Sequence, residues 1–587
     1  MEKNAALAMV LIFGLWMFYI LVMAPKPQPV ADLPVTPSDS IVQTMETPTA
    51  PDVMGQTAAG DASQLTDGMT GTLAADTIPV DTVVVSSDIY EYRFITRGGV
   101  LAGALLKKYP AFSPKGSKSP KATGSVQLVP TGGSDFLRAS LHLKNVERPI
   151  ELGTRHFKPS VSKLNLSSSR PEGKLEMVHE LSGGNRVRIV YTFSNDSYLV
   201  GAKMHLPGSL HGPEENRVEI SMGPSLVSNE KNADEDYAEY RVVYYEDGEL
   251  IDKDLGDLDE SDWSPSGERH ILWGGLKSKY FIAAFFVPEV TMAGMRASGN
   301  EDARTMAFSG FFQVPSKAEP VDFSFYVGPQ DYGELTKLNY GMGKLVEYGW
   351  SIIQFFCKYT LQIMLWMHQY ISNYAILLVL FALLVKIVFW PLTIKSTKSQ
   401  IKMQQIQPLV QQAKDKYGDD PQKVQQETMR LYKEHKVNPL GGCLPILVQM
   451  PVLISLFYVF RMTIEFRGAA AFGWISDLSQ PDPYYILPVA MGLTQFITQK
   501  MTPTSTDPKM KPMLYMMPAV MVFIFLRFSA GLVFYYTWVN VFQMAQQIYI
   551  NRQFHGEAKA KAVAAPATEQ DGSKAKKGKR AGKKKKK

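Results

Sequence analysis

Apolar residues in this chain form long runs near both ends and alternate with polar residues in the middle. A helix needs about 20 largely apolar residues to cross the hydrocarbon core of a bilayer. Six runs approach or exceed this length: 7–23, 373–393, 440–464, 484–499, 513–528 and 532–549. The pattern therefore predicts an α+β membrane protein with six transmembrane helices.

The first run is interpreted as an N-terminal transmembrane anchor, residues 1–24. It is long for a signal peptide, and Pro25 directly follows Ala24, the most suitable small residue for cleavage. Residues 25–82 are rich in Pro, Thr, Ser, Ala, Asp and Gly and poor in large apolar residues. Because such a segment cannot bury enough surface to fold, we expect a disordered tether.

Residues 83–335 alternate between apolar and polar with a period of two, as half-buried strands do. The segments 137–143, 187–193 and 321–327 each present one apolar face. A turn signal stands at Asp247-Gly248, and 280–288 is apolar enough for a fully buried strand. Many short strands separated by turn residues predict an antiparallel β-sandwich.

Residues 343–371 predict an amphipathic helix that lies in the membrane interface. Its polar residues fall close to one stripe at helical spacing: Gln354, Lys358, Gln362 and Gln369. Trp350 and Trp366 stand near its ends, which is typical of interfacial helices. We therefore exclude this segment from the transmembrane count.

Residues 396–438 predict a polar helical hairpin outside the membrane. Its apolar residues step by three and four along a seam: Met403, Ile406, Val410, Ala413 and Tyr417. Gly418 suits the end of the first helix, and Asp420 with Pro421 suits the start of the second. The seam is interpreted as packing between the two helices.

Charge decides the orientation. The chain of 587 residues has a net charge of +6, but the tail 551–587 carries 13 Lys or Arg and 3 Asp or Glu, a balance of +10. Lysines also crowd the hairpin and the 500–511 loop, whereas the 467–483 loop has one Arg and two Asp. By the positive-inside rule, both termini, the hairpin and the 500–511 loop are cytoplasmic, and the β-domain lies on the opposite side.

Lys386 stands inside the predicted second span, 372–395. A charge near the middle of a spanning helix costs about 2.5–3.5 kcal/mol, so its presence suggests a function. The alternative is that its long side chain reaches the nearby interface. Polar residues also recur within the other spans, 439–550: Gln449, Thr494, Gln495, Thr498, Gln499, Tyr535, Tyr536, Asn540 and Gln543. Singly they indicate helix packing, but with Lys386 they predict a polar cavity.

The motifs that carry nucleotide, zinc-protease or serine-hydrolase chemistry are missing from the sequence. Its nine His have no metal-ligand spacing. We therefore predict no enzyme activity, no cofactor and no metal.

Several segments resemble one known family. They are NPLGGCLPILVQMP (438–451), DPYYILP (482–488), QKMTPT (499–504), SAGLVFYY (529–536), FWPLT (389–393), TRGG (96–99) and EYGW (347–350). With these motifs the chain resembles the YidC membrane-protein insertases of the Gram-negative type, which have a large periplasmic domain.

The resemblance implies a periplasmic β-supersandwich and a five-helix core with a polar groove open to the cytoplasm and the lipid. A positive residue of the second span, typically Arg, sits in that groove, and Lys386 matches its position. Tyr536 matches a tyrosine implicated in substrate contact. The implied groove residues are Lys386, Gln449, Gln495, Gln499, Tyr536 and Asn540.

The implied function is a membrane protein insertase and chaperone of the bacterial inner membrane that passes client segments through the groove without nucleotide hydrolysis. The implied partners are nascent membrane proteins, the Sec translocon and the lipid bilayer. The basic tail has two interpretations, contact with the ribosome or with anionic lipid. Its candidate residues are Lys577, Lys579, Arg580, Lys583 and Lys584.

Two other functions fit parts of the pattern. A transporter for a small anion would use Lys386 as a ligand, and it predicts repeats or broken helices. A sugar-binding or carbohydrate-active periplasmic domain on a membrane anchor predicts paired carboxylates or a His/Glu site in a cleft.

Overall fold

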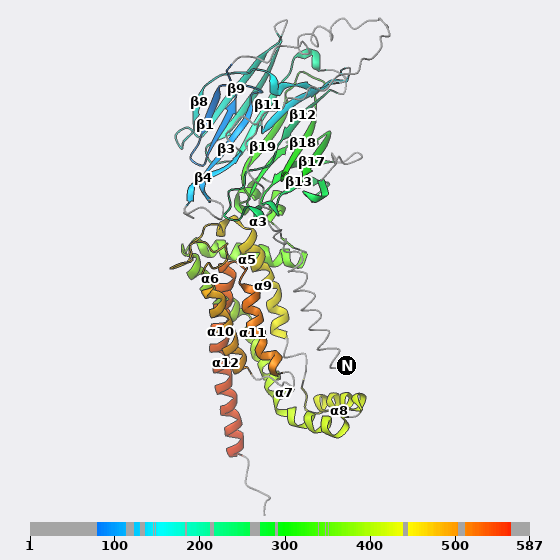
Figure 1. The fold of residues 1–587 in the computed structure, drawn as a ribbon, viewed down its shortest axis with the longest axis vertical. Coiled ribbons are helices and arrows are strands. Elements are labelled where there is room, and N and C mark those ends of the chain that lie inside the picture. Colours follow the sequence, from blue (N-terminus) through cyan, green and yellow to red (C-terminus); the bar gives the residue numbers. More distant parts are fainter. Residues whose placement is uncertain are drawn as a thin grey trace, which may run out of the picture. The chain divides into compact units, whose positions relative to one another are not determined.

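The computed structural model describes residues 79–564, apart from short segments at 113–121, 130–135, 145, 147, 182–184, 212–215, 259–269, 288–291, 339, 347, 350, 419, 438–443 and 503–510. The chain forms two compact units, one rich in strands and one helical (Figure 1). The predicted anchor and nearly all of the predicted tether lie outside the described residues, as does the tail from residue 565 onward.

Three sheets make up the strand-rich unit, and all paired strands are antiparallel except β1 with β8 (Figure 1). The first sheet has the order β4 (Ala122–Val129), β3 (Val100–Phe112), β2 (Tyr90–Ile95), β1 (Thr82–Ser86) and β8 (Lys163–Asn165). The nine-stranded sheet has the order β14 (Glu249–Asp254), β13 (Arg241–Glu246), β15 (Ile271–Lys277), β16 (Phe281–Phe286), β19 (Val321–Pro329), β11 (Leu199–His205), β10 (Arg186–Ser194), β9 (Glu172–Glu180) and β7 (Lys158–Pro159). The third has the order β17 (Gly294–Asn300), β18 (Thr305–Gln313), β12 (Arg217–Met222), β5 (Leu137–His142) and β6 (Ile150–Glu151).

The predicted strands are confirmed where apolar and polar residues alternate. β5, β10 and β19 fall on the three alternating segments, and every second residue of β10 from Val187 to Phe193 is buried. β13 and β14 join at Asp247 and Gly248, which both have positive φ angles, 47° and 89°. This backbone suits the two-residue turn of a hairpin. β16 is buried along its whole length, as its unbroken apolar sequence predicted.

Aromatic side chains join the three sheets into one core. Phe312 of β18 and Phe323 of β19 have ring centroids 5.7 Å apart, which links the third sheet to the nine-stranded one. The Tyr92 hydroxyl of β2 donates to the Val327 carbonyl of β19 at 2.7 Å, which links the first sheet to the same strand. Because buried Tyr92 has its hydrogen bond, its ring contributes apolar burial without an unpaired hydroxyl. The predicted sandwich is therefore present as a large β-rich domain of stacked sheets.

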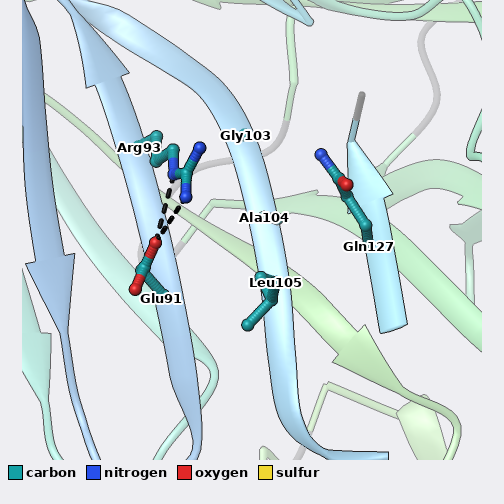
Figure 2. Close-up of a pocket in the computed structure, with 6 residues that line it drawn as sticks. All are labelled: Glu91, Arg93, Gly103, Ala104, Leu105 and Gln127. Carbon is teal, nitrogen blue, oxygen red and sulfur yellow. Dashed lines mark hydrogen bonds and ion pairs between the residues drawn. The ribbon is translucent and has the colours of Figure 1, made fainter. Parts of the chain in front are cut away.

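The first sheet carries a small polar pocket over β2, β3 and β4 (Figure 2). Its lining residues are Glu91, Arg93, Gly103, Ala104, Leu105 and Gln127. Oε1 of Glu91 accepts hydrogen bonds from Nε and Nη2 of Arg93 at 3.1 and 2.9 Å. The carboxylate of this pocket is therefore already paired with a guanidinium.

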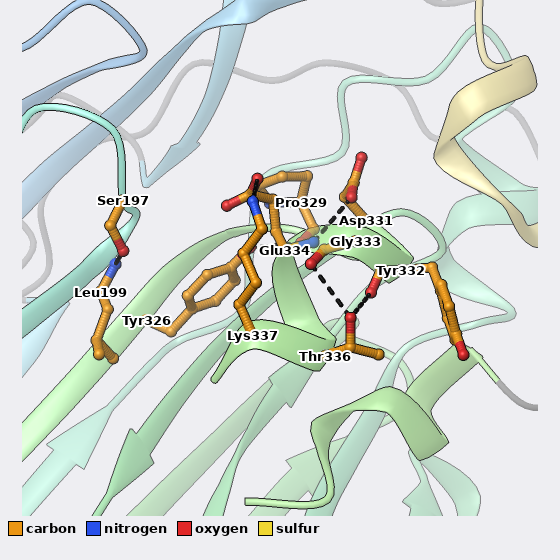
Figure 3. Close-up of polar contacts among 10 residues, drawn as sticks. All are labelled: Ser197, Leu199, Tyr326, Pro329, Asp331, Tyr332, Gly333, Glu334, Thr336 and Lys337. Atoms are coloured by element: carbon orange, nitrogen blue, oxygen red, sulfur yellow. Dashed lines mark hydrogen bonds and ion pairs between the residues drawn. The ribbon is translucent and has the colours of Figure 1, made fainter. Parts of the chain in front are cut away.

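A capped turn follows the last strand (Figure 3). The Asp331 side chain accepts from the Glu334 amide at 3.0 Å and so begins helix α4 (Tyr332–Lys337). Lys337 forms an ion pair with Glu334 at 2.9 Å one turn along the same helix. One short helix, α3 (Ala233–Tyr237), lies earlier in the chain. The cap satisfies a first-turn amide that has no partner within the helix, so α4 can begin directly after β19.

Eight helices follow α4 within the described residues. They are α5 (Ser351–His368), α6 (Tyr374–Val388), α7 (Trp390–Tyr417), α8 (Pro421–Glu434), α9 (Leu444–Met462), α10 (Ile486–Met501), α11 (Lys511–Phe525) and α12 (Ala530–Ala564). α12 packs against α6 and α10, α10 also packs against α11, and α7 packs against α8 (Figure 1). α12 continues as a helix beyond the predicted last span, 532–549.

The predicted second span, 373–393, is divided. α6 ends at Val388 and α7 begins at Trp390, and the two helices meet at an angle of 61°. Pro391 stands in the first turn of α7, where its missing N–H costs nothing and its fixed φ starts a new helix.

By length and hydropathy, this bent pair is a candidate span, whereas no single helix among the described residues meets both requirements. Shorter apolar stretches occur at Gln449–Met462 and Met516–Phe525. The count of six spans therefore stays a prediction.

Helix α5 has a third face that the sequence pattern did not separate. One face is buried through Ile353, Cys357 and Met364, and Lys358 is exposed on the polar stripe. A further stripe of large apolar residues is exposed: Ile352, Phe355, Tyr359, Ile363, Trp366 and Tyr370. An exposed apolar stripe of this kind is compatible with the predicted place in the interface.

Two packed helices cover most of the predicted hairpin, and the first of them, α7, already begins at Trp390. Ile406, Val410 and Ala413 of the predicted seam are buried, and α7 packs against α8. The Asp420 side chain accepts from the amides of Gln422 and Lys423, both at 3.1 Å, and so caps α8.

A connection built on buried aspartates joins α9 to α10. Asp482 is fully buried, and its Oδ1 accepts from Nε1 of Trp474 and from the Tyr484 amide, both at 3.0 Å. Its Oδ2 accepts from the Leu487 amide in the first turn of α10 at 2.7 Å. The Gly531 amide at the start of α12 donates to the Leu478 carbonyl of the same connection at 2.9 Å. This connection therefore sets where both α10 and α12 begin.

Replacing Asp482 by Ala is expected to destabilise the helical unit by about 3 kcal/mol, because the buried Leu487 amide and two partly buried donors, of Trp474 and Tyr484, lose their acceptor. Thermal unfolding of the full chain in detergent measures this loss. Asp420→Ala is the matched control, since it removes an exposed cap and is expected to cost about 1 kcal/mol. Equal losses in the two variants would show that the buried carboxylate of Asp482 does not hold the connection.

Candidate functional site

The Lys386 ammonium bonds to a side chain of another helix of the helical unit. Lys386 lies in the last turn of α6 and is half-buried. Its Nζ donates to Oε1 of Gln543 in α12 at 2.7 Å. The last turn of a helix favours a cation, because the helix dipole is negative there. The partner is a neutral amide, so this hydrogen bond does not pair the ammonium with a negative charge.

About two turns before Gln543 along α12, Tyr535 connects α12 to α9. Its hydroxyl, fully buried, accepts from Nε2 of Gln449 at 3.4 Å, and its ring lies 6.0 Å from that of Phe381 in α6. Tyr536, the next residue, turns instead toward α11, where its ring stacks on Phe525 at 5.7 Å. The resemblance pointed to Tyr536, but the residue that contacts Gln449 is Tyr535.

Asn540 holds two helices together. It is buried, its Nδ2 donates to the Met491 carbonyl of α10 at 3.5 Å, and its carbonyl accepts from the Thr498 hydroxyl at 3.3 Å. Gln495 and Gln499 of α10 are half-buried. Oε1 of Gln499 is buried without a hydrogen-bond partner among the described residues. Asn540 therefore contributes to α10–α12 packing, whereas Gln499 keeps hydrogen-bonding capacity.

The candidate residues thus form separate contacts. Lys386 with Gln543, Gln449 with Tyr535, and Asn540 with Thr498 are the three pairs, and no hydrogen bond within the described part of the chain joins one pair to another. The basic tail residues, Lys577, Lys579, Arg580, Lys583 and Lys584, lie outside the described residues.

Two glutamines deserve to be added to the candidates. Gln543 was one polar residue among many in the sequence, and its bond to Lys386 distinguishes it. Gln546, three residues later, is 2% exposed, and neither its Nε2 nor its Oε1 has a partner among the described residues. Their spacing of three along one helix was the only signal that could have linked them.

Comparison with known proteins identifies the chain. A family model described as the YidC periplasmic domain matches residues 82–359, and one described as 60Kd inner membrane protein matches residues 366–558. The membrane protein insertase YidC of Chlorobaculum parvum is 32% identical over 98% of this chain and 99% of its own length. The YidC insertase of Syntrophus aciditrophicus is 30% identical over 94% of this chain and 100% of its own length.

The chain belongs to the YidC family. YidC proteins are membrane protein insertases, and the description of the second family model places them in the inner membrane. The match over both units covers the β-rich domain as well as the helices that carry Lys386 and Gln543.

The crystal structure of an active YidC insertase with its first transmembrane domain resolved is 17% identical, with a TM-score of 0.33, over 82% of this chain and 96% of that one. A galactose mutarotase-like protein from Lactobacillus casei is 9% identical, with a TM-score of 0.28, over 42% of this chain and 99% of that one.

The β-domain of this YidC family member holds two carboxylates that bear on a carbohydrate-active site. The pocket in Figure 2 has one carboxylate, that of Glu91, which is paired with Arg93. A His/Glu pair lies elsewhere, where Nε2 of His142 is 2.7 Å from Oε2 of Glu219 on neighbouring strands of the third sheet. Burial works to raise the pKa of Glu219, but hydrogen bonds from Ser309 and His142 outweigh it, so the pKa is lowered. This carboxylate is suited to an ion pair and not to donating a proton at neutral pH.

Proposed function

We propose that this YidC family member inserts client segments through a polar groove among α6, α9, α10 and α12, without nucleotide hydrolysis. The observation that carries the proposal is the Lys386 ammonium, which bonds to another helix through a neutral amide and not through a carboxylate. A charged side chain among apolar helices is energetically unfavourable, so its presence indicates a functional role. Attraction of acidic client segments is the use that fits an insertase.

The energies favour this role. A translocated client segment must cross hydrocarbon at a cost of a few kcal/mol per charged residue. A hydrated groove on the cytoplasmic side shortens that path, and an ammonium at 4 Å attracts a carboxylate by about 4 kcal/mol at an effective dielectric constant of 20. Burial of the client's own apolar helix in lipid then drives the step, so no other energy source is needed.

Exposed apolar residues on two helices support release of clients to lipid. On α6 they include Ile376, Leu380 and Ile387, and on α11 they include Met516 and Phe523. In water such surfaces are unfavourable, but in a bilayer they offer a client helix a matching apolar face. We propose that client helices leave beside these two helices and α9.

The proposal includes an orientation and partners. Both termini and the hairpin are cytoplasmic, and the β-domain is periplasmic, because the hairpin is rich in lysine. The clients are nascent membrane proteins, and the Sec translocon is a proposed partner. The basic tail is proposed to contact either the ribosome or anionic lipid.

Purified full-length chain in liposomes is expected to insert a small single-span client without any nucleotide, because client burial drives the reaction. Protection of the client from external protease measures insertion. Liposomes without the chain are the control, and a client with its apolar helix replaced by a polar segment should stay unprotected. Insertion that requires ATP, or that is equal in empty liposomes, would contradict the proposal.

A further inference from the structure

The position of Lys386 makes its inward contact unusual. It lies in the last turn of α6, three residues before the break at Phe389, where a lysine side chain is long enough to reach an interface. Its Nζ instead donates to Gln543 of α12 at 2.7 Å. Among the described residues, no carboxylate lies within ion-pair distance of it.

Gln543 is suited to hold the amine and leave its charge intact. An amide oxygen accepts a charge-assisted hydrogen bond, whereas a carboxylate would neutralise the ammonium and an apolar residue would leave it without an acceptor. The polar residues that follow the same side of α12 have other partners. Asn540 bonds to Met491, and Nε2 of Gln547 donates to Asn551 at 2.9 Å. Gln543 is thus the member of this stripe that is bonded to a cation.

Gln546 has hydrogen-bonding capacity that the described residues do not use. Its side chain is three residues from Gln543 on the same helix, so the two glutamines are neighbours on its surface. It is 2% exposed, and both its amide atoms lack a partner among the described residues. Buried amide groups are rarely left unpaired, because each missing bond is destabilising. The surroundings of the ammonium therefore have hydrogen-bonding capacity left over for water or for a client.

We propose that Gln543 is a positioning residue that keeps the Lys386 ammonium turned into the helical unit and charged until an acidic client side chain takes the place of the amide. The inference rests on the proposed insertase function. The residue at position 543 then determines which clients are inserted fastest. Its amide increases the insertion rate of clients with acidic translocated segments and does not change that of clients with neutral ones.

Two substitutions of Gln543 test this in the full chain in liposomes, with two clients that differ only in an acidic or a neutral translocated segment. Gln543→Leu removes the acceptor, so the amine turns to the interface, and insertion of the acidic client falls about tenfold. Gln543→Glu neutralises the charge of the ammonium, so the insertion rate of the acidic client falls by a similar factor. The neutral client stays within about twofold in both, because it gains nothing from the charge.

Labelling of Lys386 by a water-soluble amine reagent, measured by mass spectrometry, separates the two mechanisms. Labelling rises in Gln543→Leu, where the amine is released, and falls in Gln543→Glu, where it is held more tightly. Gln553→Leu is the matched control on the same helix, since Gln553 bonds to Tyr549 and not to Lys386. It should change neither client nor the labelling.

The outcomes separate this inference from the function on which it rests. If the unsubstituted chain inserts neither client, the proposed function fails, and the labelling shifts still test the contact. If it inserts both, and Gln543→Leu either leaves the acidic client at the normal rate or slows both clients alike, Gln543 has no positioning role. Unchanged labelling in both Gln543 variants overturns the inference as well.

Discussion

Replacing Lys386 by Glu is expected to abolish the insertion of clients with acidic translocated segments. The substitution turns an attraction of about 4 kcal/mol into a repulsion of similar size. The insertion rate of acidic clients is therefore expected to fall by more than about a hundredfold. Lys386→Ala only removes the charge, so its insertion rate is expected to lie between those of Lys386→Glu and the unsubstituted chain. Protease protection of the client in liposomes measures each rate.

Lys386→Arg is the control that keeps the charge. Its guanidinium carries more donors than an ammonium, so it can bind a client carboxylate in two places and still reach Gln543. We expect it to insert acidic clients as fast as Lys386 or faster. Equal insertion by the Glu, Ala and Arg variants would remove the electrostatic part of the mechanism and leave only burial of the client helix.

The largest expected effect on stability is that of Gly275→Ala in β15. A Cβ atom at this position would lie 2.0 Å from the Ala283 carbonyl oxygen and 2.5 Å from the Ala284 Cα in the paired strand β16. These are backbone atoms, so relief requires the two strands to separate in the interior of the nine-stranded sheet. The lost pairing is several kcal/mol, comparable with the about 5–15 kcal/mol that hold a whole domain folded.

Gly201→Ala in β11 is the matched control. Its Cβ would meet nothing nearer than Thr192 at 3.8 Å, an ordinary contact. The variant should be neutral or gain about 0.4–1 kcal/mol, because alanine lowers the entropy of the unfolded chain. Limited proteolysis of the full-length variants should therefore degrade the β-domain of Gly275→Ala and spare that of Gly201→Ala. Equal resistance would mean that β15 and β16 are spaced more widely than described here.

Much of the fold was predictable because local patterns determine it. Alternation with period two predicted β5, β10 and β19, since one face of each strand is buried and the other is not. Asp420 and Pro421 predicted the start of α8, since caps act within one helical turn. The sequence analysis did not predict the division of the second span at Phe389, although Pro391 stands nearby. An apolar run gives the length of a helical segment but not whether its axis bends.

The candidate site was predicted only in part. Lys386 was found because a charge in an apolar run is conspicuous in any sequence. Tyr536 and Asn540 were chosen from the sequence in preference to Gln543 and Tyr535, because the four are polar residues of one helix and their sequence positions do not show which neighbours they contact. Their partners lie on α6, α9, α10 and α11, up to 157 residues away in the chain.

By itself, the sequence determined the two-part organisation of this YidC family member, most of its strands, its helical hairpin and the presence of the Lys386 cation in an apolar run. These features depend on residue type and spacing, which are read along the chain. Only the tertiary structure decided that the Lys386 amine bonds to Gln543 and that Asn540 serves packing. The reason is that hydrogen bonds between helices depend on how each helix is rotated about its axis, and packing of the whole helical unit sets that rotation.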